Sequence, residues 1–101
     1  MDMNKLMKQA QEMQKKLETA QEKIKEMVVE SSVGGGMVYL KMNGKFEILE
    51  LDIKDEVINP QEKDILKDLI ISAFNQAKKK AEEMSSEELQ KITGGLNIPG
   101  M

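Results

Sequence analysis

Apolar residues recur along the first quarter of the chain at alternating spacings of three and four, which places them on one side of an α-helix. No Gly or Pro interrupts the chain before residue 34, and Asp2 precedes the pattern as a helix N-cap. The pattern predicts a helix over residues 3–28, a rod of roughly 39 Å at about 1.5 Å per residue. The apolar seam of this helix consists of Met3, Leu6, Ala10, Met13, Leu17, Ala20, Ile24 and Met27.

The composition of this seam favours a helix packed in a mixed core over an autonomous coiled coil. Ala10 and Ala20 permit close approach by a different helix, and Lys16 and Lys23 would meet no acidic partner in a parallel pair. A seam of this length is also more than one protomer of 101 residues can cover by itself. We therefore expect a homodimer.

Beyond the first helix the apolar period changes to two, which is typical of β-strands. Three strands are predicted, over residues 28–33, 37–42 and 45–53. Gly34-Gly35-Gly36 separates the first two strands. Asn43-Gly44 separates the second and third, and it predicts a type I′ turn in which both residues take a positive φ. Short connections between consecutive strands predict an antiparallel meander with one face covered by helix.

A second helix is predicted from Asn59 to Ile92. Asn59 is a suitable N-cap, Pro60 suits the first helical position, and Gly94-Gly95 ends the helix. The element order predicts an α+β fold with a three-stranded antiparallel sheet, in one domain over residues 1–101. The apolar stripe of the second helix is Ile65, Leu66, Leu69, Ile70, Ala73, Phe74, Ala77, Ala81 and Met84.

The composition excludes several classes of chemistry. The chain has no Cys and no His, so structural zinc, haem and iron–sulfur sites lack their ligands, and a Ser–His or Cys–His nucleophile lacks its base. The triple glycine is followed by a strand instead of a helix, so it does not fit a phosphate-binding loop. We expect no enzyme activity and no cofactor. The absence of a signal-peptide pattern and of a long apolar segment predicts a cytoplasmic protein.

The charge pattern by itself argues mildly against nucleic acid as the partner. Fifteen basic residues, all of them Lys, face 18 acidic ones, for a net charge of −3. Two groups of lysines still stand out. Lys78, Lys79 and Lys80 form the one basic run, and Lys8, Lys15, Lys16 and Lys23 recur along the first helix. Without further information, both groups are typical of solvated helix surface. Lys80 lies at the edge of the apolar stripe, so we expect its stem to pack on apolar surface.

Several segments taken together resemble the YbaB/EbfC family of bacterial nucleoid-associated proteins. The resemblance covers the whole chain in order, and it is carried by residues 3–16, 34–38, 43–44, 73–77 and 92–100. It implies an α–β–β–β–α protomer that pairs through its sheet into a tweezer-like dimer with long projecting helices. It also implies binding of double-stranded DNA with little sequence preference, and a role in organising or compacting the nucleoid.

The resemblance and the lysines together give a specific expectation for the DNA contacts. With no Arg, the chain lacks the side chain that reads guanine through two hydrogen bonds, so contacts between Lys and phosphate are expected instead. The candidates, in order of expectation, are Lys78, Lys79 and Lys80, then Lys91, then Lys8, Lys15, Lys16 and Lys23. The alternative is a protein-interaction or chaperone-like clamp that holds its partner between the helical arms. No membrane or small-molecule partner is expected.

Overall fold

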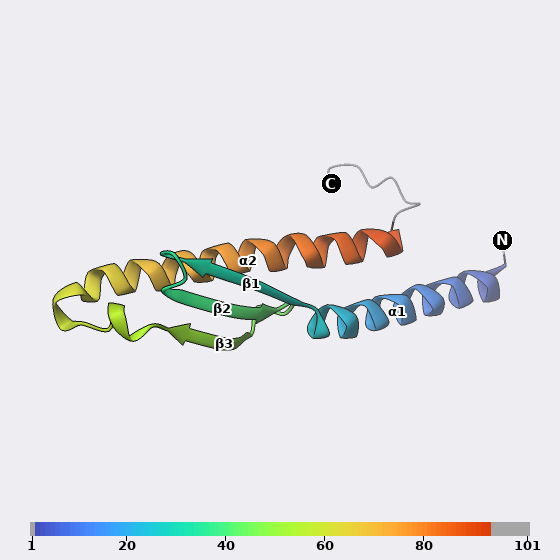
Figure 1. Ribbon diagram of the computed structural model, residues 1–101. Helices are drawn as coiled ribbons and strands as arrows, with labels where there is room; N and C mark the ends of the chain where they lie inside the picture. The colour runs from blue at the N-terminus through green and yellow to red at the C-terminus, as the bar shows by residue number, and fades with distance from the viewer. Residues whose placement is uncertain (1, 94–101) are drawn as a thin grey trace.

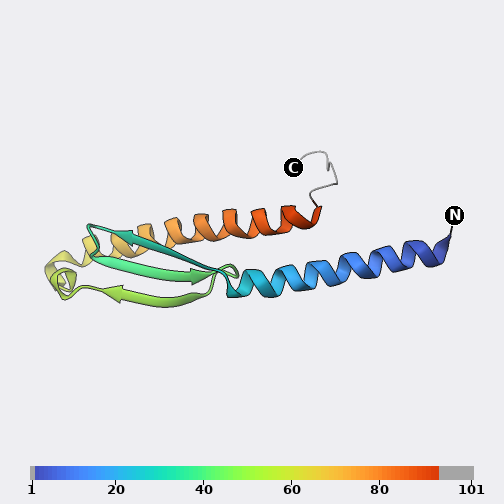
Figure 2. The same ribbon diagram turned by 45° about the vertical axis from the view of Figure 1, so that its right-hand side comes forward.

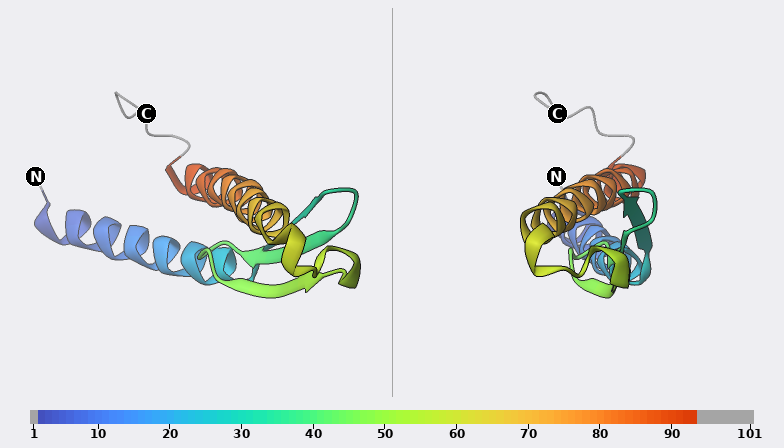
Figure 3. Two further views of the ribbon diagram at one scale, coloured as in Figure 1. Left: turned by 90° about the vertical axis from the view of Figure 1, so that its left-hand side faces the viewer. Right: turned by 60° about the vertical axis from the view of Figure 1, so that its left-hand side comes forward.

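The structure is a computed structural model that describes residues 2–93. The chain forms helix α1 (Met3–Glu26), strands β1 (Val28–Val33), β2 (Val38–Asn43) and β3 (Ile48–Ile53), two short 3₁₀ turns, and helix α2 (Lys63–Thr93) (Figure 1). This order confirms the predicted α–β–β–β–α protomer. The protomer is elongated, with principal extents of 70 × 25 × 17 Å. Figure 2 and Figure 3 show both long helices extending from the same end of the sheet.

Helix α1 begins as the sequence predicts and ends slightly earlier. The Asp2 side chain accepts a hydrogen bond from the Asn4 backbone N–H, so Asp2 is the N-cap. The helix stops at Glu26 instead of residue 28, because Val28 already pairs with Asn43 as the first residue of β1. The apolar seam of α1 is buried where α2 lies beside it and exposed toward the N-terminus. Ala20 and Ile24 are buried, whereas Met3 and Leu6, at the far end of the helix, are exposed.

The strands form the predicted antiparallel meander in the order β1-β2-β3. Helix α2 packs on β1 and β2, and the hydrophobic core lies between them. Ser31 of β1 belongs to this interface, where its buried hydroxyl donates to the Ala73 carbonyl at 2.7 Å. The fully buried residues are Val38, Leu40 and Met42 of β2 and Ala73, Ala77 and Ala81 of α2, with Val33 of β1 at their edge. The small side chains of α2 let the helix lie close to the sheet.

The connection between β2 and β3 is not the predicted type I′ turn. The positive φ falls on Phe46, at 65°, and not on Asn43 or Gly44. Asn43 organises the loop with its side chain instead, because its Oδ1 accepts from the backbone N–H groups of Lys45 and Glu47. Gly44 is required for a different reason. A Cβ at this position would overlap the Ile24 carbonyl oxygen, to which the Gly44 N–H donates at 3.1 Å. This contact joins the end of α1 to the sheet.

Helix α2 begins after the predicted cap. Asn59 Oδ1 accepts from the Gln61 N–H, and Pro60 opens a 3₁₀ turn that leads directly into the helix. The helix then continues without interruption to Thr93, as predicted for residues up to Ile92. The stop predicted at Gly94-Gly95 lies outside the described residues. Because α2 is longer than the sheet, its second half extends beyond the strands and packs beside α1 (Figure 1).

Candidate nucleic-acid interface

Two grooves of the molecule differ in their charged side chains. At about 100° per residue, Lys16 and Lys23 border one side of the apolar seam of α1, and Glu12 lies on the same flank. Lys15 lies on the face away from the seam, about 20° from Glu22. A groove of about 400 Å³ between α1 and α2 is lined by Lys15, Lys16, Thr19, Ala20, Lys23, Glu88 and Ile92. A second groove, of about 300 Å³, is lined by Glu18, Gln21, Glu22, Lys25 and Lys45.

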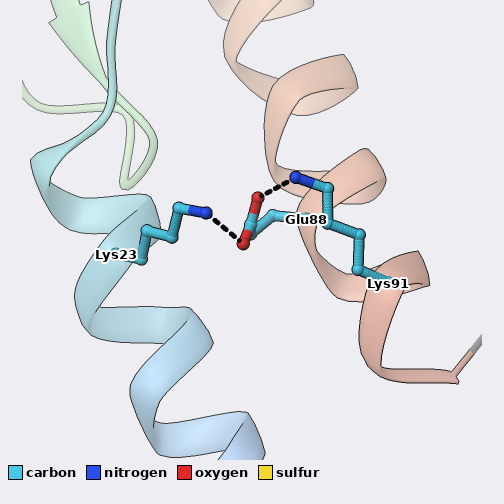
Figure 4. A network of polar contacts seen from close by, with 3 residues as sticks. All are labelled: Lys23, Glu88 and Lys91. Atoms are coloured by element: carbon cyan, nitrogen blue, oxygen red, sulfur yellow. Dashed lines mark hydrogen bonds and ion pairs between the residues drawn. The ribbon is translucent and has the colours of Figure 1, made fainter.

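We call the first of these the lysine groove. Lys23 of α1 and Lys91 of α2 meet there on a single carboxylate, that of Glu88 (Figure 4). Lys23 Nζ lies 3.0 Å from Glu88 Oε1, and Lys91 Nζ lies 3.1 Å from Oε2. Hydrogen bonds from the two ammonium groups lower the pKa of Glu88 below its ordinary value, although partial burial acts in the opposite direction. Glu88 is therefore ionised at neutral pH and connects the two helices.

The lysine groove brings together four of the eight candidate lysines. Lys15, Lys16 and Lys23 line it, and Lys91 reaches its carboxylate from the next turn of α2. Lys8 is exposed and lies on the same face of α1 as Lys15, two turns nearer to the N-terminus, but it does not line the groove. The four lysines of the groove come from two helices, so their proximity depends on the packing of α1 against α2.

The basic run at residues 78–80 does not form a single surface. The three side chains leave α2 about 100° apart. Lys80 Nζ donates to the Glu30 carbonyl of β1 at 2.7 Å, and Lys78 Nζ lies 3.9 Å from Glu82 Oε1. Lys79 is exposed and forms no ion pair with another described residue. All three remain outside the lysine groove. The Lys80 ammonium therefore binds β1, and the expected packing of its stem on apolar surface stays a prediction.

The open face of the sheet carries mainly acidic side chains. Cross-strand pairing places Glu30, Lys41 and Glu50 in one row, and Ser32, Tyr39 and Asp52 in the next. Tyr39 donates its phenol proton to Glu30 at 2.9 Å. That hydrogen bond, with help from the nearby carboxylates, raises the pKa of Tyr39 to about 12. Three carboxylates and one lysine make this face unfavourable for a phosphate backbone.

No functional role was assigned to Glu88 from the sequence alone. The spacing of three between Glu88 and Lys91 predicts a pair on one helix face. Nothing in the sequence predicts the contact with Lys23, because that contact depends on how α1 lies against α2. Among residues 2–93, no group of three or more acidic side chains is arranged to hold a metal ion. No described helix is long and apolar enough to cross a membrane.

By its fold, the chain is a small α+β protein in which two long helices extend beyond a three-stranded sheet. Cationic side chains line the groove between the two helices. The chain belongs to the YbaB/EbfC DNA-binding family, which matches residues 1–96. This confirms the resemblance found in the sequence. Two bacterial relatives of the chain are named nucleoid-associated proteins.

The similarity to individual relatives extends over almost the whole chain. A nucleoid-associated protein of Clostridium acetobutylicum is 51% identical over 100 residues, which cover 99% of this chain and 89% of the relative. A nucleoid-associated protein of Alkaliphilus metalliredigens is 48% identical, with 99% and 88% covered. The crystal structure of an uncharacterised protein from Helicobacter pylori matches with a TM-score of 0.83 at 30% identity, over 93% of this chain and 99% of that one.

Proposed function

We propose that the protein binds double-stranded DNA with little sequence preference, through contacts between lysines and phosphates, and thereby organises or compacts the bacterial chromosome. The observation that carries the proposal is the lysine groove, which Lys15, Lys16 and Lys23 line and which Lys91 approaches from α2. Because lysines outnumber carboxylates there, an acidic protein with a net charge of −3 still presents a locally positive surface to DNA. The proposal places the protein at the nucleoid, in the cytoplasm.

The absence of Arg supports weak sequence discrimination. Lys presents a compact point charge, which attracts phosphate but does not form the planar pair of hydrogen bonds that identifies guanine. Binding should therefore be dominated by counterion release. If a dimer makes about four phosphate contacts, log affinity falls with log salt at a slope of roughly −4, because each contact contributes about −0.9.

The homodimer is part of the same proposal, and β3 is the surface that supports it. Leu51 lies opposite Leu40 in the sheet register, on the face that α2 covers over β1 and β2. Leu40 is 1% exposed, whereas Leu51 is 44% exposed because α2 does not extend over β3. Ile48 and Leu49 are about equally exposed. An apolar edge strand of this kind favours pairing with a second copy.

Sedimentation equilibrium of the wild type at micromolar concentration tests the dimer, and a clean monomer would contradict it. Leu51→Asp should shift the protein toward the monomer, because it places a charge in the proposed interface. Met7→Asp is the matched control, since Met7 is a comparably exposed apolar residue on α1, far from the sheet. This control should sediment like the wild type.

Gel shifts with unrelated DNA sequences across a salt series test DNA binding. Lys15→Gln together with Lys16→Gln should weaken binding to every sequence alike and reduce the magnitude of the salt slope. The control removes the same number of charges at the opposite groove, with Lys25→Gln and Lys45→Gln. This control should retain most of the affinity.

A second pair of substitutions tests the basic run at residues 78–80, which the sequence analysis expected first among the DNA contacts. Lys78→Glu with Lys79→Glu changes two exposed side chains and should leave the fold intact. An unchanged affinity and salt slope would remove this run from the DNA site. If the wild type shifts no DNA at low salt, the nucleoid proposal fails. The clamp between the helical arms then takes its place, with salt-insensitive binding of unfolded chains as its signature.

A further inference from the structure

Glu88 is the buried member of the polar cluster in the lysine groove. Its side chain is 9% exposed, whereas the side chains of Lys23 and Lys91 are 56% and 68% exposed. The carboxylate therefore lies beneath two ammonium groups that reach solvent. Each ammonium carries three N–H donors and uses one of them on Glu88. The remaining donors are available to an acceptor that approaches from outside.

The geometry of the cluster resembles a prepared site for an anion. The two ammonium groups bond opposite oxygens of one carboxylate, so Glu88 holds them near each other although they belong to different helices. A free Lys side chain loses rotamer entropy when it is fixed. In this cluster part of that cost is met before any ligand binds. The cluster keeps a net charge of +1, and Lys15, Lys16 and Thr19 line the same groove.

We propose that Glu88 is a positioning residue that holds Lys23 and Lys91 ready to receive a backbone phosphate of DNA. This inference rests on the proposed DNA binding and names one phosphate site within it. The phosphate binds to the exposed side of the two ammonium groups, while Glu88 remains on their buried side. Glu88 therefore supports the anion site although it carries the same sign of charge as the ligand.

The proposal makes a prediction opposite to that of net charge alone. Glu88→Gln removes one negative charge from the groove, so a purely electrostatic role for Glu88 predicts tighter DNA binding in the variant. The glutamine amide has only one oxygen that can accept from an ammonium, and its NH₂ group repels the other. The variant can hold only one of the two lysines, so we expect weaker binding.

The experiment compares Glu88→Gln with Glu87→Gln in the full-length protein. Glu87 is the adjacent residue on α2 and is exposed, so its substitution makes the same change in charge outside the cluster. We expect Glu88→Gln to weaken binding of a random-sequence duplex by roughly tenfold. The magnitude of its salt slope should also fall, by up to about 0.9 per groove, because Lys23 and Lys91 share one phosphate. Glu87→Gln should bind as tightly as the wild type, or slightly more tightly.

The salt slope separates positioning from a merely structural role. A variant that is partly unfolded loses active protein at every salt concentration, which lowers the apparent affinity but leaves the slope unchanged. Thermal unfolding followed by circular dichroism measures the folded fraction independently. If Glu88→Gln does not fold, Lys23→Gln with Lys91→Gln tests the phosphate site, because the proposal requires this pair to lower the slope by about 0.9 per groove, the contribution of the one phosphate that the two lysines share.

The outcomes distinguish this inference from the function on which it depends. If the wild type does not bind DNA, the proposed function itself is wrong. If the wild type binds, and Glu88→Gln equals or exceeds Glu87→Gln in affinity with an unchanged slope, DNA binding stands and the positioning role of Glu88 is wrong. In a Lys23→Gln and Lys91→Gln background, adding Glu88→Gln should have no further effect on the slope.

Discussion

Strands β2 and β3 are adjacent and both rich in apolar residues, yet those of β2 are buried and most of those of β3 are exposed. The residues Val38, Leu40 and Met42 of β2 are at most 1% exposed. On β3, Ile48, Leu49 and Leu51 are between 44% and 52% exposed. The difference comes from α2, which packs chiefly on β1 and β2, so that only Ile53 of β3 packs against the core. The exposed apolar side chains of β3 are the observation on which the proposed dimer rests.

The largest expected effect contrasts one residue from each of these strands. Leu40→Ala removes a buried side chain and should lower the free energy of unfolding by about 2–5 kcal/mol. Leu51→Ala should cost much less in the isolated protomer, because its side chain is already half exposed, and should mainly weaken the dimer. Urea unfolding at several protein concentrations separates the two effects. Equal losses at high dilution would show that β3 is part of the protomer core.

Gly44→Ala and Gly35→Ala contrast the turns at the two ends of the sheet. A Cβ at Gly44 would overlap backbone of α1, so this substitution should displace the helix from the sheet and destabilise the protein more. Gly35 has open space around it but a φ of +66°, so Ala there should cost about 1 kcal/mol of backbone strain. Thermal unfolding of both variants measures the order. A smaller effect at Gly44 would show that the contact between α1 and the turn is loose.

A smaller effect distinguishes the two faces of β1. Ser31→Ala removes the hydroxyl that donates to the Ala73 carbonyl and should cost about 1 kcal/mol of unfolding free energy. Ser32→Ala lies on the open face, where the side chain is exposed, and should change stability by no more than about 0.5 kcal/mol. Chemical unfolding of the two variants provides the measurement, and equal effects would contradict the assignment of the covered face.

The smallest effect concerns the helical end of the molecule and depends on pH. Because the folded-state pKa of Glu88 is lowered, its ion pairs stabilise the protein above the ordinary carboxyl pKa, and this contribution is lost as the pH falls through the folded value. The difference in melting temperature between wild type and Glu88→Gln should therefore shrink as the pH is lowered below about 4.5. A difference in melting temperature that stays constant from pH 7 to below about pH 4.5 would contradict the ion-pair account.

Most of the fold could be predicted because its signals are local. The seam of α1, the period-two strands and the Asn59-Pro60 start of α2 each lie within a few consecutive residues, and the structure confirms all three. Errors arose where a local signal had a non-local cause. Asn43-Gly44 correctly indicated a turn. However, Gly44 is required by its close contact with Ile24, and the residue with a positive φ is Phe46.

The sequence by itself determined the type and order of the elements, the all-Lys basic chemistry and the family. The tertiary structure decided which lysines gather and which apolar strand stays uncovered. Lys78, Lys79 and Lys80 are neighbours in the chain but leave α2 in three directions, since a helix turns about 100° per residue. Lys23 and Lys91 are far apart in the chain but share the Glu88 carboxylate, because α1 packs beside α2. Helical periodicity is a property of each segment alone, whereas a groove between two helices exists only once both are packed.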